Sequence, residues 1–206
     1  MASFILGVIL VFCIGFMAGS IIYRTHFIKL LSAFSFVFLF YKFSFSLQFA
    51  IFAFLVMLLI SISVIDCFYK IIPVIFSAFL IIFGILSSFI NLTLGETCLS
   101  RFLNSFLGVF TGGGSLFILG VLGQFVYKKE VIGGGDVKLM AGVGAFIGWE
   151  KVLFAIFVAA VLCGIVGLIL VFLKKIERKE YIPFGPFLST ASFISLFIPK
   201  PSLMFI

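Results

Sequence analysis

Repeated apolar runs dominate this chain and restrict what it can fold into. Hydrophobic residues make up 64% of its 206 residues, and charged residues make up only 10%. Many of the runs approach the roughly 20 residues that an α-helix needs to cross a bilayer. No polar segment is long enough to fold as a second domain. We therefore expect one polytopic, all-α membrane helix bundle over residues 1–206, and we exclude a soluble globular protein.

Eight apolar segments can be delimited, and the charges between them predict an orientation. The first lacks the basic start and the cleavage site of a signal peptide, so we expect a helix there. With the N-terminus outside, basic residues are concentrated in the inner loops, as the positive-inside rule requires. The segments cover residues 4–22, 28–41, 46–65, 73–90, 102–126, 137–149, 151–173 and 185–199, of which the second, sixth and eighth are short for full spans. The inner loops hold Arg24, Lys29, Lys70, Lys128, Lys129, Lys138, Lys174, Lys175, Arg178 and Lys179, and the outer loops hold Lys42, Arg101, Lys151 and Lys200.

The net charge and the cysteines exclude several classes of partner and cofactor. A charge of +7 is dispersed among short loops with no base-stacking platform beside it, so we expect contact with membrane lipids and none with nucleic acid. The four cysteines stand singly and His26 is the only histidine, so the sequence predicts no metal site. Cys67 has no histidine base nearby, which disfavours a thiol protease.

Only two aspartates occur, and both stand at the ends of apolar runs on the predicted inner face. Asp66 directly follows the third segment, and Asp136 directly precedes the sixth. A carboxylate beside hydrocarbon is costly, so two on one face indicate chemistry. Two carboxylates that share a proton can activate a water and protonate a leaving amine. The sequence thus favours an intramembrane aspartyl peptidase.

Each aspartate also has a structural interpretation that the sequence leaves open. The three glycines at 133–135 would let a substrate backbone lie close to Asp136, but Asp136 could equally be the N-cap of the next helix. Asp66 could be a solvated boundary residue that pairs with Lys70 one turn later.

Glycines gather in the fifth to seventh segments. Gly108-x-x-x-Gly112 and Gly144-x-x-x-Gly148 fit the pattern that lets helix backbones approach closely. We expect these glycines to pack within one bundle, with a homodimer seam as the alternative. The run from Gly112 to Gly114 leaves open a break in the fifth helix, which is a feature of transporters.

An ordered set of motifs runs through nearly the whole chain. It comprises Gly15 followed by Tyr23-Arg24; Ile65-Asp66 with Pro73; Gly133-Gly134-Gly135-Asp136 with Lys138, Leu139 and Gly144; the segment from Gly142 to Trp149; and Ile182-Pro183-Phe184-Gly185-Pro186-Phe187-Leu188. Together these motifs resemble the type IV prepilin peptidases, a branch of the GxGD aspartyl proteases.

The resemblance implies a specific activity. Members cut the short basic leader from prepilins and pseudopilins of type IV pilus and type II secretion systems, after a glycine, at the cytoplasmic face of the inner membrane. It implies that Asp66 and Asp136 are the catalytic pair, with base and acid unassigned because coupled carboxylates titrate as a pair. It implies no cofactor for cleavage. It also implies substrate-binding roles for Gly133, Gly134, Gly135, Lys138, Pro183, Phe184, Gly185 and Pro186, with a snorkelling Lys138 as the alternative.

Two departures from the family pattern concern methyl transfer. Many members carry a zinc-binding insert between the first two helices and are also N-methyltransferases, whereas here Arg24 leads within a few residues to the second segment. Gly19 stands where members commonly have asparagine. The sequence therefore predicts cleavage and leaves methylation from S-adenosylmethionine open.

Three glutamates on the predicted inner face could contact a substrate, and two functions other than a peptidase are considered. Glu130, Glu177 and Glu180 are candidate contacts for a basic leader, with surface ion pairs as the simpler interpretation. The alternatives to a peptidase are a multi-pass transporter and a non-catalytic subunit of a pilus or secretion assembly. The position of the acids at loops disfavours the transporter, and the presence of both aspartates disfavours the non-catalytic subunit.

Overall fold

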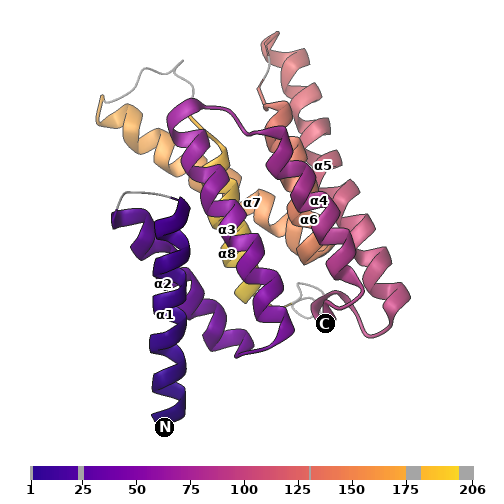
Figure 1. Ribbon diagram of the computed structural model, residues 1–206. Coiled ribbons are helices and arrows are strands. Elements are labelled where there is room, and N and C mark those ends of the chain that lie inside the picture. The colour runs from indigo at the N-terminus through magenta and orange to yellow at the C-terminus, as the bar shows by residue number, and fades with distance from the viewer. Residues whose placement is uncertain (1, 23–25, 130, 175–181, 200–206) are drawn as a thin grey trace. The chain divides into compact units, whose positions relative to one another are not determined.

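The protein is all-helical over the residues that a computed structural model describes, which are 2–22, 26–129, 131–174 and 182–199 (Figure 1). Each of the eight predicted apolar segments forms an α-helix, which confirms the expected fold class. The helices are α1 Ala2–Ile22, α2 His26–Phe43, α3 Leu47–Tyr69, α4 Val74–Ser88, α5 Cys98–Tyr127, α6 Gly134–Ile147, α7 Trp149–Phe172 and α8 Gly185–Phe197, with a 3-10 turn η1 at Leu92–Leu94.

Three of the described helices are long and apolar enough to cross a membrane. They are α3 with 23 residues, α5 with 30 and α7 with 24. Shorter apolar helices include Val74–Ser88 and Gly185–Phe197. The sixth and eighth segments are short as expected, with 14 residues in α6 and 13 in α8. This set of helices is that of an integral membrane protein.

The chain divides into two compact units, residues 1–61 and 62–206. In the first unit α1 and α2 meet at Gly15, where a Cβ would lie 2.9 Å from the backbone of Ala33. The Ser32 hydroxyl donates to the Gly15 carbonyl over 2.7 Å at the same contact. Tyr23 and Arg24, which extend this motif, lie outside the described residues. Both aspartates belong to the second unit, and the expectation of a single domain stays a prediction.

Glycines seat α6 against two neighbours inside the second unit. A Cβ on Gly108 of α5 would collide with the Gly144 carbonyl of α6, and a Cβ on Gly144 would collide with the Gly108 carbonyl. On the other side, a Cβ on Gly142 would lie 2.5 Å from the Cβ of Leu80 on α4. Every described residue of α6 from Leu139 to Ile147 is buried. The predicted packing of these glycines within one bundle is therefore confirmed.

Side chains from neighbouring segments satisfy the last carbonyls of α6. The final turn of a helix leaves its carbonyls without intrahelical partners. Ser105 Oγ donates to the Ala145 carbonyl over 2.8 Å, and Asn91 Nδ2 donates to the Phe146 carbonyl over 2.9 Å. These buried hydrogen bonds fix the C-terminal end of α6 and with it the position of its first turn.

The glycine run in α5 does not interrupt the helix. Residues 112–114 lie within the continuous helix Cys98–Tyr127. The suggestion of a broken fifth helix was wrong, because the helix needs a close approach to α6 here rather than an unwound backbone.

The contact between α5 and α6 leads to a stability prediction. Gly108→Val places a branched side chain against the Gly144 backbone, so we expect a loss of about 1–3 kcal/mol and a lower thermal midpoint in detergent. Gly114→Val is the matched control, because no described atom lies within 4 Å of its Cβ position. Equal midpoints for the two variants would contradict this packing.

Candidate active site

Asp66 is a buried residue in the last turn of α3. The helix continues past the predicted end of the third segment to Tyr69, where Lys70 adopts a φ of 55° and donates its N–H to the Asp66 carbonyl over 2.8 Å. The Asp66 side chain is only 3% exposed. Its Oδ2 accepts a hydrogen bond from the Gly185 N–H over 2.9 Å. The interpretation of Asp66 as a solvated boundary residue was therefore wrong.

Gly185 begins α8 and holds the Asp66 carboxylate. Pro186 lies in the first turn of this helix, where proline is favoured and N–H groups have no intrahelical partner. The helix N-terminus also attracts negative charge. A Cβ on Gly185 would lie 2.7 Å from Asp66 Oδ2 and 3.0 Å from its Cγ, so any side chain at this position would displace the carboxylate. The sequence analysis missed this contact, although Pro186 signals the free N–H groups of a helix start.

Asp136 is the third residue of α6 and is also buried. Gly133 is the N-cap, with φ −69° and ψ 142°, and its carbonyl accepts the Asp136 N–H over 3.0 Å. The Asp136 side chain is 4% exposed. The interpretation of Asp136 as the N-cap was thus wrong, because the N-cap lies three positions earlier, at Gly133. The first turn of α6 positions the Asp136 carboxylate, and hydrogen bonds to the last carbonyls of α6 hold the opposite end of this helix.

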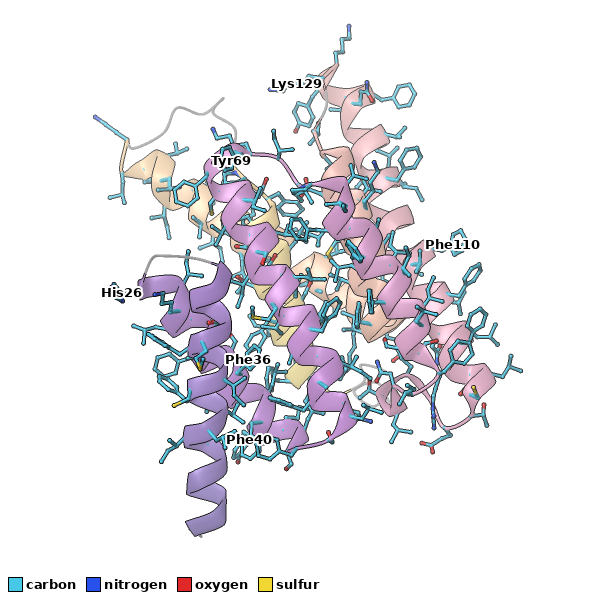
Figure 2. The ribbon with its side chains drawn as sticks, in the orientation of Figure 1. His26, Phe36, Phe40, Tyr69, Phe110 and Lys129 are labelled. Atoms are coloured by element: carbon cyan, nitrogen blue, oxygen red, sulfur yellow. The ribbon has the colours of Figure 1, made fainter. Side chains whose placement is uncertain are left out.

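Two packing contacts bring the surroundings of the aspartates together within the second unit. A Cβ on Gly135 would lie 2.9 Å from the Cβ of Ile72, which follows α3 on the link to α4. Met140, one turn after Asp136, lies with its Sδ 3.9 Å from Ser192 Oγ on α8. Figure 2 shows Tyr69, at the end of α3, and Lys129, which precedes the glycine loop, at the same end of this unit.

Asp136 has the protonation behaviour of one member of an acid pair. It lies in the first turn of α6, which is not among the helices long enough to cross a membrane. Burial, and secondly the charge of Asp66, raise the pKa of Asp136 from 3.8 to about 7. Two carboxylates that experience each other's charge cannot easily ionise together, so we expect one of these two to hold a proton while the other is charged. An aspartic peptidase uses a pair of carboxyls in these two states, and that role for Asp66 and Asp136 stays a prediction.

Comparison with known proteins agrees with this chemistry. A family model described as the type IV leader peptidase family matches residues 52–168, a range that includes both aspartates. The chain belongs to this family. The resemblance found in the sequence motifs is thereby confirmed.

Named relatives of this leader peptidase family member include two proteins that are longer than this chain and one that is shorter. The prepilin leader peptidase/N-methyltransferase of Pseudomonas aeruginosa is 30% identical over 138 residues, which are 67% of this chain and 46% of that protein. The protein of the same name from Burkholderia pseudomallei is 38% identical over 90 residues, 43% of this chain and 29% of that protein. Leader peptidase HopD of Salmonella typhimurium is 35% identical over 102 residues, 48% of this chain and 66% of HopD. The chain thus spans less than half the length of the first two relatives. No solved structure matches it.

The remaining residues assigned to the substrate differ in their surroundings. Gly134 is exposed and has no described atom within 4 Å of its Cβ position, whereas a Cβ on Gly133 would lie 3.3 Å from Asp136 Oδ2. Lys138 is exposed on α6. Pro183, Phe184 and Pro186 are half-buried beside Gly185. Substrate binding by these residues stays a prediction.

The three glutamates considered as contacts for a basic leader, Glu130, Glu177 and Glu180, lie outside the described residues. Within the described ranges, no group of three His, Cys, Asp or Glu side chains could hold a metal ion.

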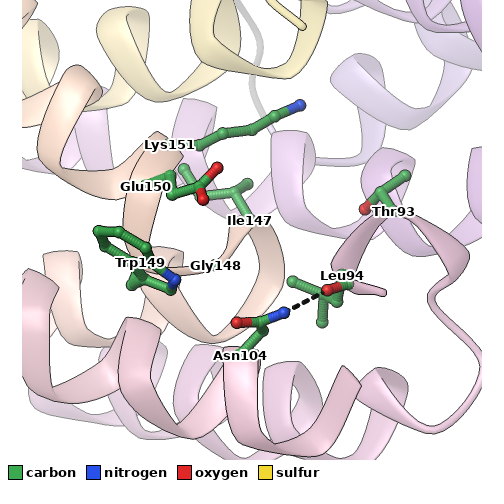
Figure 3. A pocket seen from close by; sticks show the side chains of 8 residues that line it. All are labelled: Thr93, Leu94, Asn104, Ile147, Gly148, Trp149, Glu150 and Lys151. Carbon is green, nitrogen blue, oxygen red and sulfur yellow. Dashed lines mark hydrogen bonds between the residues drawn. The ribbon is translucent and has the colours of Figure 1, made fainter. Parts of the chain in front are cut away.

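A small pocket lies at the other end of α6 (Figure 3). Along α6, Ile147 in the lining of this pocket lies 11 positions after Asp136, a rise of about 17 Å. Asn104 Nδ2 donates to the Leu94 carbonyl over 2.6 Å at its edge. Its lining residues are Thr93, Leu94, Asn104, Ile147, Gly148, Trp149, Glu150 and Lys151. This pocket is therefore distinct from the aspartate centre.

The contact of Gly185 with Asp66 leads to a second prediction. Gly185→Ala keeps the N–H but places a methyl group against the buried carboxylate, so we expect a loss of about 1–3 kcal/mol in stability. Gly164→Ala on α7 is the control, because no described atom lies within 4 Å of its Cβ position. Thermal unfolding in detergent compares the two, and equal midpoints would show that Gly185 does not abut Asp66.

Proposed function

We propose that this protein is an intramembrane aspartic endopeptidase that cleaves the basic leader from type IV prepilins or pseudopilins. The observation that carries the proposal is the pair of buried carboxylates, Asp66 near the end of α3 and Asp136 at the start of α6. Membership of the type IV leader peptidase family supports it. The names of the relatives attach prepilin leader cleavage to those proteins.

The geometry supports different roles for the two aspartates. The Gly185 N–H donates to the Asp66 carboxylate, and this hydrogen bond favours the ionised form of Asp66 against the larger, opposite effect of its burial. Asp136, with its raised pKa, retains the proton. We therefore assign Asp66 as the base that activates water and Asp136 as the acid that polarises the scissile carbonyl.

Asp66 and Asp136 can together carry out every proton transfer that peptide hydrolysis needs. Asp66 takes a proton from water as the water oxygen bonds to the scissile carbon, and Asp136 gives its proton to the carbonyl oxygen. As the tetrahedral intermediate collapses, that proton returns to Asp136, the C–N bond breaks, and Asp66 protonates the leaving amine. The cycle restores one ionised and one protonated carboxyl, so cleavage requires no cofactor.

We expect the substrate polypeptide to approach Asp136 from the side of Gly134. Gly134 is exposed and open at its Cβ position, so an extended substrate backbone can approach the first turn of α6. Basic residues such as Lys70, Lys128 and Lys129 lie near this end of the helices, which supports its location at the cytoplasmic face of the inner membrane. The apolar stem of a prepilin would remain in the lipid while its leader stays cytoplasmic.

Methylation of the new N-terminus from S-adenosylmethionine remains open. The names of the longer relatives join both activities, but this chain matches less than half of their length. The transporter alternative is not favoured, because the glycine run of α5 lies in an unbroken helix.

Co-expression with a type IV prepilin tests the proposed function. We expect intact-mass analysis to show loss of the leader with the wild type, and at least a hundredfold slower loss with Asp66→Asn or Asp136→Asn, because each variant removes one proton-transfer group. Gly164→Ala serves as the active control. Leader removal that persists in both Asn variants would overturn the aspartyl mechanism, and an added methyl mass would reveal methyl transfer.

A further inference from the structure

The hydroxyl groups of α8 include one that departs from the pattern of its neighbours. Thr190 Oγ1 donates to the Pro186 carbonyl over 2.8 Å, and Ser195 Oγ donates to the Ser192 carbonyl over 2.6 Å. Such bonds to the preceding turn satisfy hydroxyls within helices. Ser189 Oγ is buried and has no hydrogen-bond partner among the described residues, although the side chain is only 6% exposed. A buried polar group without a partner is rare and calls for an explanation.

Ser189 lies on the face of α8 that is turned toward the aspartate centre. Residues three and four apart share one face of a helix, so Ser189 lies between Gly185 and Ser192. Gly185 donates to Asp66, and Ser192 contacts Met140, one turn beyond Asp136. The unpaired hydroxyl thus lies between a residue that contacts Asp66 and a residue that contacts Met140, four positions after Asp136.

Ser77 on α4 provides a comparison. Its Oγ is the other buried side-chain oxygen without a partner in the described part of the chain. The next turn of its helix packs Leu80 against Gly142, deep in the interface with α6. Neither serine hydrogen-bonds to an aspartate in the described structure, but Ser189 shares its helix face with Gly185, the donor to Asp66. The two serines therefore share chemistry and burial but differ in their relation to the site.

We propose that the Ser189 hydroxyl donates a hydrogen bond to the carbonyl oxygen of the scissile peptide, beside protonated Asp136. This inference rests on the proposed peptidase function. The carboxylate of Asp66 is an acceptor, so a peptide carbonyl in the site needs donors, and Ser189 supplies one that no other group occupies. A fixed donor aimed at an oxygen that gains negative charge stabilises the transition state more than the bound substrate.

Steady-state cleavage of a prepilin by the purified full chain in lipid nanodiscs tests this role. For Ser189→Ala we expect kcat to fall about a hundredfold with little change in KM, as for the loss of one donor to a developing oxyanion. The thermal midpoint should be unchanged or higher, because the variant removes an unpaired buried hydroxyl. Ser77→Ala is the matched control and should keep the wild-type kcat with the same effect on stability.

The outcomes separate this inference from the function on which it rests. Wild-type turnover by Ser189→Ala would overturn the role of Ser189 while the peptidase function stands. An equal fall in kcat for Ser77→Ala, or a fall in the thermal midpoint of Ser189→Ala that accompanies its loss of activity, would also overturn it by indicating a packing effect. Absence of cleavage by the wild type would refute the proposed function, and the role of Ser189 with it.

Discussion

The hydrogen bond from the Gly185 backbone to the Asp66 carboxylate is the interaction on which the site depends. It joins residues 119 positions apart and places the start of α8 against the last turn of α3. A carboxylate that is 3% exposed needs a donor, and the first turn of a helix has N–H groups to give. The missing side chain of Gly185 makes the approach possible. The next turn of α8 places Ser189 on the same face of the helix as Gly185.

The second aspartate depends on a different constraint, the burial of a short helix. Glycine contacts let α4 and α5 pack closely against α6, and hydrogen bonds from Ser105 and Asn91 satisfy the carbonyls at its C-terminal end. With that end fixed, the first turn of α6 carries Asp136 to a defined place. The 14-residue helix α6 thus brings the Asp136 carboxyl into the interior of the unit. There, burial and the charge of Asp66 raise the pKa of Asp136.

The sequence predicts the helices and the two aspartates because these depend on local composition. Apolar runs specify helices in lipid, and acids at their ends are costly enough to indicate a purpose. Local patterns do not specify which backbone group meets Asp66, because that bond depends on the packing of α8 against α3. Local patterns also failed to locate the start of α6. The N-cap is Gly133, which has no side chain to mark it as a cap, and Asp136 lies inside the first turn. The unpaired state of Ser189 is likewise visible only once the neighbouring carbonyls are placed.

Infrared difference spectroscopy of the Asp136 carboxyl tests the central claim, that the two aspartates form one buried acid pair. The protonated-carboxyl band that Asp136→Asn removes should persist far above the ordinary pKa of 3.8 and disappear as the pH rises through about 7. In an Asp66→Asn background the band should disappear at lower pH, because the charge of Asp66 is one cause of the raised pKa. Ionisation of Asp136 near its ordinary pKa, with no response to Asp66→Asn, would contradict the account, because the two carboxyls would then not meet.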